Sequence, residues 1–290
     1  MFAFLSEPAG GGIGLAFTDR EGGASAGAFA SLNLGRTTED DPDALRANMA
    51  ALRSRLGLPP VSFVHQVHGT AVKTVACEDL PGRDGWLGGA VPGQAPLDEA
   101  DALVTKLPDA PLAVRVADCV PVLLADAEAG VIGAAHAGRR GLLAGVLTAT
   151  AARMRELGAT RIRAWVGPHI CGDCYEVPAG MRSESCAVIP ELEAMTSWGS
   201  PSLDLGAGAQ AVLERDGIGV ERHDPCTRTG PRLFSHRRDR GATGRQIGLI
   251  WRAGRGDRST RHGLSGYPNS SRVIHDDRSW SEGESACRER

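Results

Sequence analysis

Three short apolar runs, separated by turn-forming and reactive residues, lie close together at residues 112–116, 120–125 and 131–135. Runs of this length bounded by turn residues are typical of buried β-strands. Residues 127–130 suit a hairpin turn between the second and third runs. Asp118, Cys119 and His136 stand where the runs stop. Because the ends of strands usually display the chemistry of a scaffold, we expect this stretch to organise both the fold and the site.

Other segments predict further strands and helices around this stretch. The strand candidates are residues 13–18, 61–67, 70–76, 101–105, 162–166, 219–221 and 246–251. Helical spacing of apolar residues predicts helices over 40–56, 138–157 and 203–216. Asp41 suits the N-cap of the first helix and Pro42 its first turn. Residues from about 180 to 200 show only weak patterning.

Composition narrows the classes of partner and compartment. The formal net charge of -3 gives no reason to expect a nucleic acid or an anionic membrane as partner. No apolar run approaches the roughly 20 residues that span a bilayer, and the N-terminus lacks the basic region of a signal peptide. Seven cysteines, odd in number and irregularly placed, argue against a disulfide framework. We therefore expect a protein of the reducing cytoplasm.

The end of the chain differs from the rest. From residue 253 onward the sequence is rich in charge, serine and arginine and poor in apolar residues. Such a composition cannot bury enough apolar surface to fold. We therefore predict one folded domain over residues 1–252 and a disordered tail over 253–290.

His68, Cys119 and His136 are candidate metal ligands. Two imidazoles and one thiolate suit Zn²⁺, and three protein ligands leave the open position of a catalytic site. Their spacing alone does not single them out, so two other interpretations stay open. Cys119 can be a nucleophile with His136 as its base and Asp118 nearby, or a small buried core residue. A regular strand would point His65 away from His68.

A CxxC pair occurs at Cys171 and Cys174. A structural zinc site normally uses a second pair at comparable spacing, which the sequence lacks. A redox CxxC opens a helix, whereas residues 175–178 have an extended pattern. These arguments favour a pair without function.

Several arginines are candidates for anion binding. Arg139 and Arg140 begin the helix predicted after His136, where free backbone N–H groups can also hold phosphate. Arg20 and Asn33 belong to a long Gly- and Ser-rich loop, residues 17–35. A loop of this length without periodicity is either functional or poorly ordered. The alternative for the arginines is ordinary solvation.

Ten motifs, taken together, resemble one protein family. The central four are QVHG (66–69), ADCVP (117–121), HAGRRG (136–141) and GPHICGDCYEV (167–177). Those before them are TDREGGAS (18–25), SLNLG (31–35) and DDP (40–42), and those after them are CT (226–227), LFSHRRD (233–239) and TGRQIGLIW (243–251). In this order, over roughly residues 10–252, they resemble the YfiH family. That family was long labelled multicopper polyphenol oxidoreductase or laccase-like, and also peptidoglycan editing factor.

The resemblance implies a fold, a metal and an activity. The fold is α/β (α+β), a layered sandwich of mixed β-sheets flanked by helices. The metal is zinc on His68, Cys119 and His136, with copper as the metal of the older label. The activity is phosphorolysis of purine nucleosides (adenosine, inosine, guanosine or methylthioadenosine), with deamination of adenosine. Cytoplasmic location, phosphate as co-substrate and a monomer or homodimer complete this expectation.

Two other activities remain open at the same site. Bacterial members are credited with removing wrongly incorporated amino acids from a cell-wall precursor, which is amide hydrolysis. Copper-dependent oxidation of phenols is disfavoured, because one cysteine and two histidines do not provide several copper sites.

Roles follow for individual side chains. We predict that Cys119, Asp118 and Arg140 are catalytic, with Asp118 carrying protons. We predict that Arg20, Asn33 and Arg140 bind substrate. Arg139 stands where the family commonly has tryptophan, which removes an aromatic surface near the metal.

Overall fold

The computed structural model describes residues 1–8, 12–37, 39–82, 84–90 and 95–253. The predicted tail at residues 253–290 lies, apart from Ala253, outside the described residues.

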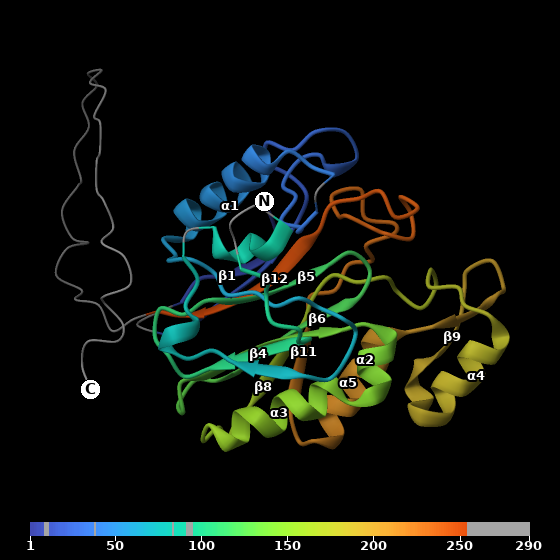
Figure 1. The fold of residues 1–290 in the computed structure, drawn as a ribbon. Coiled ribbons are helices and arrows are strands. Elements are labelled where there is room, and N and C mark those ends of the chain that lie inside the picture. The colour runs from blue at the N-terminus through green and yellow to red at the C-terminus, as the bar shows by residue number, and fades with distance from the viewer. Residues whose placement is uncertain (9–11, 38, 83, 91–94, 254–290) are drawn as a thin grey trace, which may run out of the picture.

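Two layers of strands, one a mixed sheet and one an antiparallel sheet, form the centre of the molecule (Figure 1). A six-stranded sheet runs in the order β11–β8–β6–β7–β4–β3, and a four-stranded sheet in the order β1–β2–β12–β5. The first contains β11 (Gly219–Arg222), β8 (Arg163–Val166), β6 (Val120–Asp126), β7 (Val131–Ala137), β4 (Ala102–Thr105) and β3 (Val72–Thr74). The second contains β1 (Phe2–Ser6), β2 (Ile13–Thr18), β12 (Gln246–Arg252) and β5 (Leu112–Val116). A separate hairpin pairs β9 (Glu193–Met195) with β10 (Pro201–Leu203).

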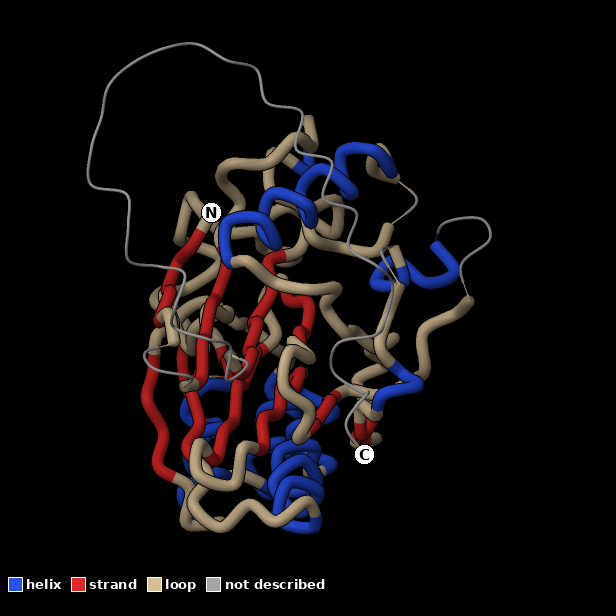
Figure 2. Tube along the Cα trace, turned by 90° about the vertical axis from the view of Figure 1, so that its left-hand side faces the viewer, coloured by secondary structure: helices blue, strands red, loops and turns tan. Residues whose placement is uncertain are grey.

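Helices cover both outer faces of the sheets (Figures 1 and 2). The helices of the described part are α1 (Pro42–Leu56), α2 (Arg139–Ala144), α3 (Val146–Glu156), α4 (Ala179–Val188) and α5 (Leu205–Arg215). Short 3₁₀ turns occupy Gly27–Phe29, Cys77–Asp79, Gly85–Ala90 and Pro190–Leu192. One buried cluster joins α1 to the four-stranded sheet, a second joins the two sheets, and a third joins the six-stranded sheet to α3 and α5. The predicted layered sandwich of sheets flanked by helices is confirmed, although only the six-stranded sheet is mixed.

The central stretch forms the strands that its apolar runs predict. Every residue of β5, β6 and β7 is buried, because sheet or helix covers both faces. β6 and β7 form an antiparallel hairpin, and Gly130 adopts the positive φ of 66° that its turn requires. β5 belongs to the other sheet, so the chain crosses between sheets at residues 117–119.

The first helix also follows its prediction. The Asp41 side chain accepts a hydrogen bond from the Asp43 backbone, and Pro42 occupies the first turn. Leu45, Met49 and Leu52 lie on the buried face. In the described part of the chain no helix has the length and apolar character needed to cross a membrane.

Three predictions of secondary structure were wrong in part. Residues 61–67 form no strand and pair only through single bridges at Ser62 and His65. The helix predicted over 138–157 divides into α2 and α3 at Gly145, whose φ of 95° interrupts helical geometry. The weakly patterned segment near 180–200 contains α4 and the β9–β10 hairpin. The ten residues of α4 bury only Ser185, so no apolar period marks this helix.

Candidate metal centre and active-site cavity

The crossing between the two sheets positions Cys119. It stands directly before β6, and Asp118 beside it takes a φ of 98°, which allows the tight change of direction. In the hairpin register Pro121 lies opposite His136. The sequence predicted a strand that ends at residue 135, just before His136. His136 instead lies within β7, and strand pairing holds it near Cys119.

The QVHG turn brings in His68. The Asp101 carboxylate accepts hydrogen bonds from three consecutive backbone N–H groups of this turn, at 3.2, 2.9 and 2.6 Å. The Gln66 amide bonds both the N–H and the carbonyl of Arg115, at 2.9 and 2.8 Å. These side-chain hydrogen bonds take the place of a backbone pair between strands, so residues 61–67 do not form a continuous strand. The turn gives His68 a φ of 62°.

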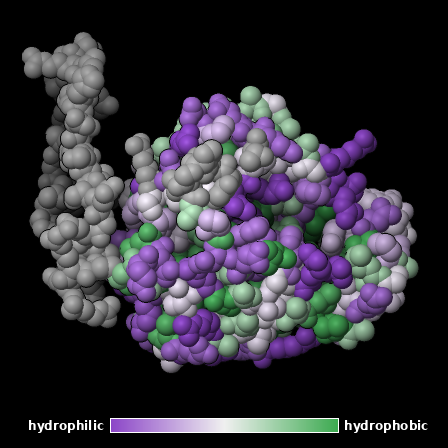
Figure 3. Space-filling view, in the orientation of Figure 1, coloured by the Kyte–Doolittle hydropathy of each residue, from purple (hydrophilic) through white to green (hydrophobic). Residues whose placement is uncertain are grey.

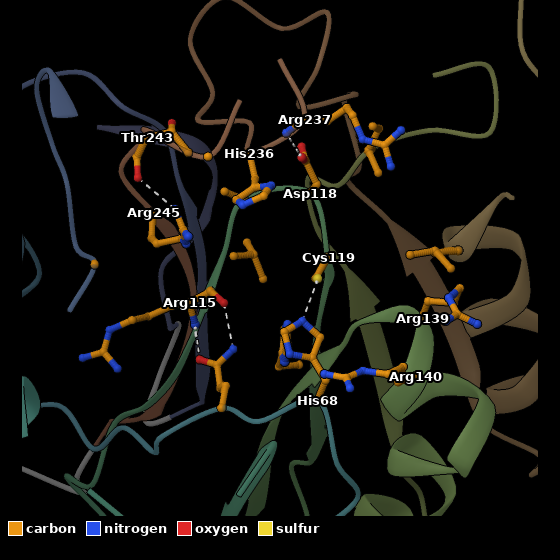
Figure 4. Close-up of a pocket in the computed structure, with 18 of the residues that line it drawn as sticks. His68, Arg115, Asp118, Cys119, Arg139, Arg140, His236, Arg237, Thr243 and Arg245 are labelled. Atoms are coloured by element: carbon orange, nitrogen blue, oxygen red, sulfur yellow. Dashed lines mark hydrogen bonds between the residues drawn. The ribbon is translucent and has the colours of Figure 1, made fainter. Parts of the chain in front are cut away.

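The three predicted ligands come together. Their donor atoms all lie within 4.8 Å of one another, and His68 Nε2 lies 3.7 Å from Cys119 Sγ (Figure 4). His65 is not a member of this group. Gly138 packs against it so closely that a Cβ there would lie 2.5 Å from the His68 ring.

Asp101 supports the group of three ligands, and the sequence did not single it out. Its Oδ1 lies 2.8 Å from Nδ1 of His136, and both side chains are buried. An Nδ1–H that donates to this carboxylate leaves Nε2 of His136 free to bind a metal. The signal in the sequence was slight: an aspartate at the start of a predicted apolar strand.

Cys119 and His136 each stabilise the charged form of the other. Burial acts to raise the pKa of Cys119, but the adjacent His136 and His68 outweigh it and lower that pKa to about 6. Burial acts to lower the pKa of His136, but Cys119 and Asp101 outweigh it and raise that pKa to about 9. The site thus favours a thiolate, the form of cysteine that binds metals and attacks electrophiles.

The donor set fits a soft or borderline divalent metal. A thiolate and two imidazoles, with one tautomer fixed by a carboxylate, match the ligand chemistry of zinc sites with three protein ligands. Metal identity does not follow from the donors alone, since imidazole and thiolate also suit copper.

A cavity of about 900 Å³ opens onto this group. Hydrophilic residues predominate on the face shown in Figure 3, which is hollowed near its centre. Figure 4 shows the lining side chains around the ligands. The arginines that line the cavity are Arg36, Arg115, Arg139, Arg140, Arg237 and Arg245. Such a rim favours an anionic ligand.

Asp118 is held in this cavity from two sides. Thr227 donates its hydroxyl to one carboxylate oxygen at 2.6 Å, and the backbone N–H of Arg237 donates to the other, also at 2.6 Å. Both carboxylate oxygens are thereby held, which fixes the orientation of the group.

The arginines differ in how they are held. Arg139 reaches Ser185 at 3.5 Å, and Arg237 donates to the Glu176 carbonyl. Arg36 and Arg140 line the cavity without an ion pair or hydrogen bond to any side chain or backbone group that the structure describes. These two are available to a ligand.

Arg20 and Asn33 hold the loop that the sequence assigned to substrate. Arg20 is not among the cavity-lining residues; it donates to the Ala30 carbonyl and lies over the Phe234 ring. Asn33 lines the cavity but is fully buried, and its amide bonds Asp40 and the backbone of Arg245. Both side chains order residues 17–35, which makes this long loop a defined wall.

The fold and the site together define a layered α+β class of protein with a Cys–His–His group that could hold a metal ion. Residues 14–253 match the family model described as multi-copper polyphenol oxidoreductase laccase, and the chain belongs to that family.

Relatives with names or structures support the same grouping. A purine nucleoside phosphorylase of Streptomyces coelicolor is 48% identical over 245 residues, covering 83% of this chain and 96% of the relative. The crystal structure of protein NMB0706 of Neisseria meningitidis matches with a TM-score of 0.71 and 36% identity, covering 88% of this chain and 99% of that one. The crystal structure of YfiH of Bacillus licheniformis matches with a TM-score of 0.74 and 27% identity, covering 85% of this chain and 98% of that one. The resemblance drawn from the motifs is confirmed.

Proposed function

We propose that this protein is a zinc-dependent purine nucleoside phosphorylase that also deaminates adenosine. The observation that carries the proposal is the convergence, in one cavity, of the three-ligand group, the fixed Asp118 carboxylate and the unpaired Arg36 and Arg140. Relatives named purine nucleoside phosphorylase support it.

The cavity suits the two substrates. Its volume of about 900 Å³ lies within the usual range of about 300–1,000 Å³ for small-molecule sites. Phosphate needs cationic donors, and Arg36 and Arg140 offer two guanidinium groups without competing partners. We assign phosphate binding to these two and loop positioning to Arg20, whose guanidinium faces Ala30 and Phe234.

Phosphorolysis requires proton control as well as positioning. A phosphate oxygen forms a bond to the anomeric carbon, the glycosidic bond breaks, and the purine leaves with its electron pair and takes up one proton. We assign that proton transfer to Asp118, whose carboxylate is held by two hydrogen bonds in the cavity. In deamination the same carboxylate would take a proton from the attacking water and deliver it to the departing amino group.

His68, Cys119 and His136 would hold the metal. When bound, zinc supplies a Lewis acid beside the substrate. Asp101 fixes the His136 ring and the His68 turn, and Cys119 contributes the thiolate charge. Arg140, at the start of α2, lines the same cavity as His68 (Figure 4).

Product analysis tests the activity. Full-length protein is incubated with adenosine, with and without phosphate, and the products are separated by chromatography. Adenine that forms only with phosphate supports phosphorolysis, and inosine supports deamination. Cleavage of a UDP-linked muramoyl amino acid, with nucleosides untouched, would replace the proposal by precursor editing.

Metal analysis and two variants test the site. Protein purified without added metal is expected to contain zinc; copper in its place, with oxidation of phenols, would contradict the proposal. Cys119→Ser should lose both metal at this site and activity. Asp118→Asn should keep the metal and lose activity, whereas Arg55→Gln, on the exposed face of α1, should behave as the wild type.

A further inference from the structure

A second cluster of sulfur ligands lies outside the group just described. The Sγ atoms of Cys171, Cys174 and Cys226 all lie within 4.8 Å of one another. Tetrahedral zinc–thiolate geometry, with bonds near 2.3 Å, places sulfurs about 3.8 Å apart. The CxxC pair that lacked a partner in the sequence gains one from a segment far along the chain.

Strand pairing produces this convergence. β8 and β11 are parallel neighbours, so the segments that follow them leave the sheet at the same edge. A single bridge between His169 and Cys226 continues the pairing, and the Thr227 N–H donates to the His169 carbonyl at 2.9 Å. The two loops are therefore held side by side before any sulfur contact is counted.

The CxxC loop is bent so that its sulfurs face one point. The backbone N–H groups of Cys174 and Tyr175 both donate to the Cys171 carbonyl, at 3.0 Å each. The Cys171 N–H lies 3.5 Å from the Cys226 sulfur and points to it. An N–H directed at sulfur favours the thiolate, which is the form that ligates metals.

The pKa of Cys226 shifts in the opposite direction to the pKa values of Cys171 and Cys174. Burial acts to raise the pKa of Cys226, but backbone N–H groups of Cys171 and Thr229 outweigh it and lower that pKa. Burial, together with the Cys226 sulfur, raises the pKa values of Cys171 and Cys174. The geometry remains the observation that points to a metal: three sulfurs close to one another, one of which accepts a backbone N–H, match the donor set of a thiolate metal site.

We propose that Cys171, Cys174 and Cys226 form a second metal centre, which binds Zn²⁺ through three thiolates. With a water in the fourth position, the centre would join the two loops that support Asp118. The Ile170 N–H donates to the Asp118 carbonyl at 3.0 Å, and Thr227 donates to its carboxylate. Each of these donors is the immediate neighbour of a cluster cysteine. The centre therefore fastens together the two segments that orient the proton carrier.

Zinc stoichiometry tests this inference independently of any nucleoside activity. Full-length protein, reduced, loaded with Zn²⁺ and freed of excess metal, should contain two zinc ions per chain. Cys119→Ser and Cys226→Ser should each contain one, and the double variant none. Cys186→Ser, a cysteine of α4 outside both groups, should contain two. One zinc in the wild type, unchanged in Cys226→Ser, would overturn the proposal.

A spectroscopic measurement covers the case in which Cys226→Ser does not fold. Cobalt added to metal-free Cys119→Ser protein should give intense ultraviolet sulfur-to-cobalt charge transfer, since the cluster is the remaining thiolate site in the described part of the chain. The same variant should gain thermal stability on addition of Zn²⁺ and lose it with a chelator. Absence of the charge-transfer bands, or a disulfide between two of these cysteines in protein prepared under reducing conditions, would refute the centre.

Discussion

One carboxylate oxygen of Asp101 lies 2.8 Å from Nδ1 of His136 and 2.9 Å from the backbone nitrogen of His68. The same atom thus orients one predicted metal ligand through its ring and the other through its main chain. Because Asp101 is fully buried, water cannot replace it in either role.

Replacement of Asp101 should weaken metal binding. In Asp101→Asn an amide replaces a carboxylate that orients two ligands, so zinc affinity should fall by about 10- to 100-fold. Competition with a chromophoric chelator measures the change. Asp98→Asn, an exposed aspartate three residues earlier, serves as the control. Equal affinity in both variants would show that Asp101 does not support the ligands.

Gly138 should be required for the site but not for the fold. Its φ of -73° and ψ of 161° suit any residue. An alanine Cβ would nevertheless lie 2.5 Å from His68 Cδ2 and 3.1 Å from Cys119 Sγ. Gly138→Ala should therefore reduce zinc affinity at this site by about tenfold, or about 1.4 kcal/mol.

The melting temperature of Gly138→Ala should change little, because the strain falls on two site side chains. Gly219→Ala, where an added Cβ meets nothing within 4 Å, is the matched control. A variant that binds zinc normally would mean that His68 can move aside without cost.

Replacement of Arg140 should weaken phosphate binding and leave metal binding unchanged. It lines the cavity and has no ion-pair partner among the described residues, so its charge is free for the co-substrate. Loss of one charged hydrogen bond costs about 1.5–3 kcal/mol, which corresponds to a rise of about 10- to 100-fold in KM for phosphate. Phosphate-saturation kinetics of Arg140→Gln, with Arg55→Gln as control, measure it; an unchanged KM would exclude this role.

The stability of the β6–β7 hairpin should depend on pH through Asp126. This buried carboxylate accepts hydrogen bonds from backbone N–H groups of Glu128, Ala129, Thr160 and Arg161. Burial acts to raise the pKa of Asp126, but these donors outweigh it and lower that pKa. Because the pKa of Asp126 is lower in the folded state, its carboxylate stabilises the folded protein at pH values above the unfolded-state pKa of about 3.9. This contribution disappears as the pH falls through the folded-state pKa.

Asp126→Asn should therefore lower the free energy of unfolding by about 1–3 kcal/mol at neutral pH. The difference from wild type should shrink below about pH 4. Urea unfolding at pH 7 and pH 3 measures both values. Asp43→Asn, an exposed carboxylate on α1, should show little difference at either pH, and a pH-independent effect of Asp126→Asn would contradict the linkage.

The core strands and the ligand set were accessible from sequence because their signals are local. Continuous apolar runs predicted β5, β6 and β7, and capping residues predicted α1. The three ligands were reached through family motifs, because their spacing does not distinguish them from other cysteines and histidines. His68 in particular depended on the QVHG motif.

What the sequence did not reveal depends on tertiary placement. Asp101 supports the ligands through backbone groups of a distant turn, which leaves no trace in residue spacing. Cys226 joins Cys171 and Cys174 because β8 and β11 are parallel neighbours, a pairing that sequence patterns do not specify. The strand expected at residues 61–67 failed because a glutamine side chain replaced part of the backbone ladder.

The β6–β7 hairpin has a consequence for how the site assembles. Cys119 and His136 are brought together by one local pairing, whereas His68 comes from 51 residues before Cys119. Local contacts form early in folding at small entropic cost. Two ligands would then be in place before the QVHG turn docks on Asp101. The arrival of His68 would be the late, long-range step that completes the group of three ligands.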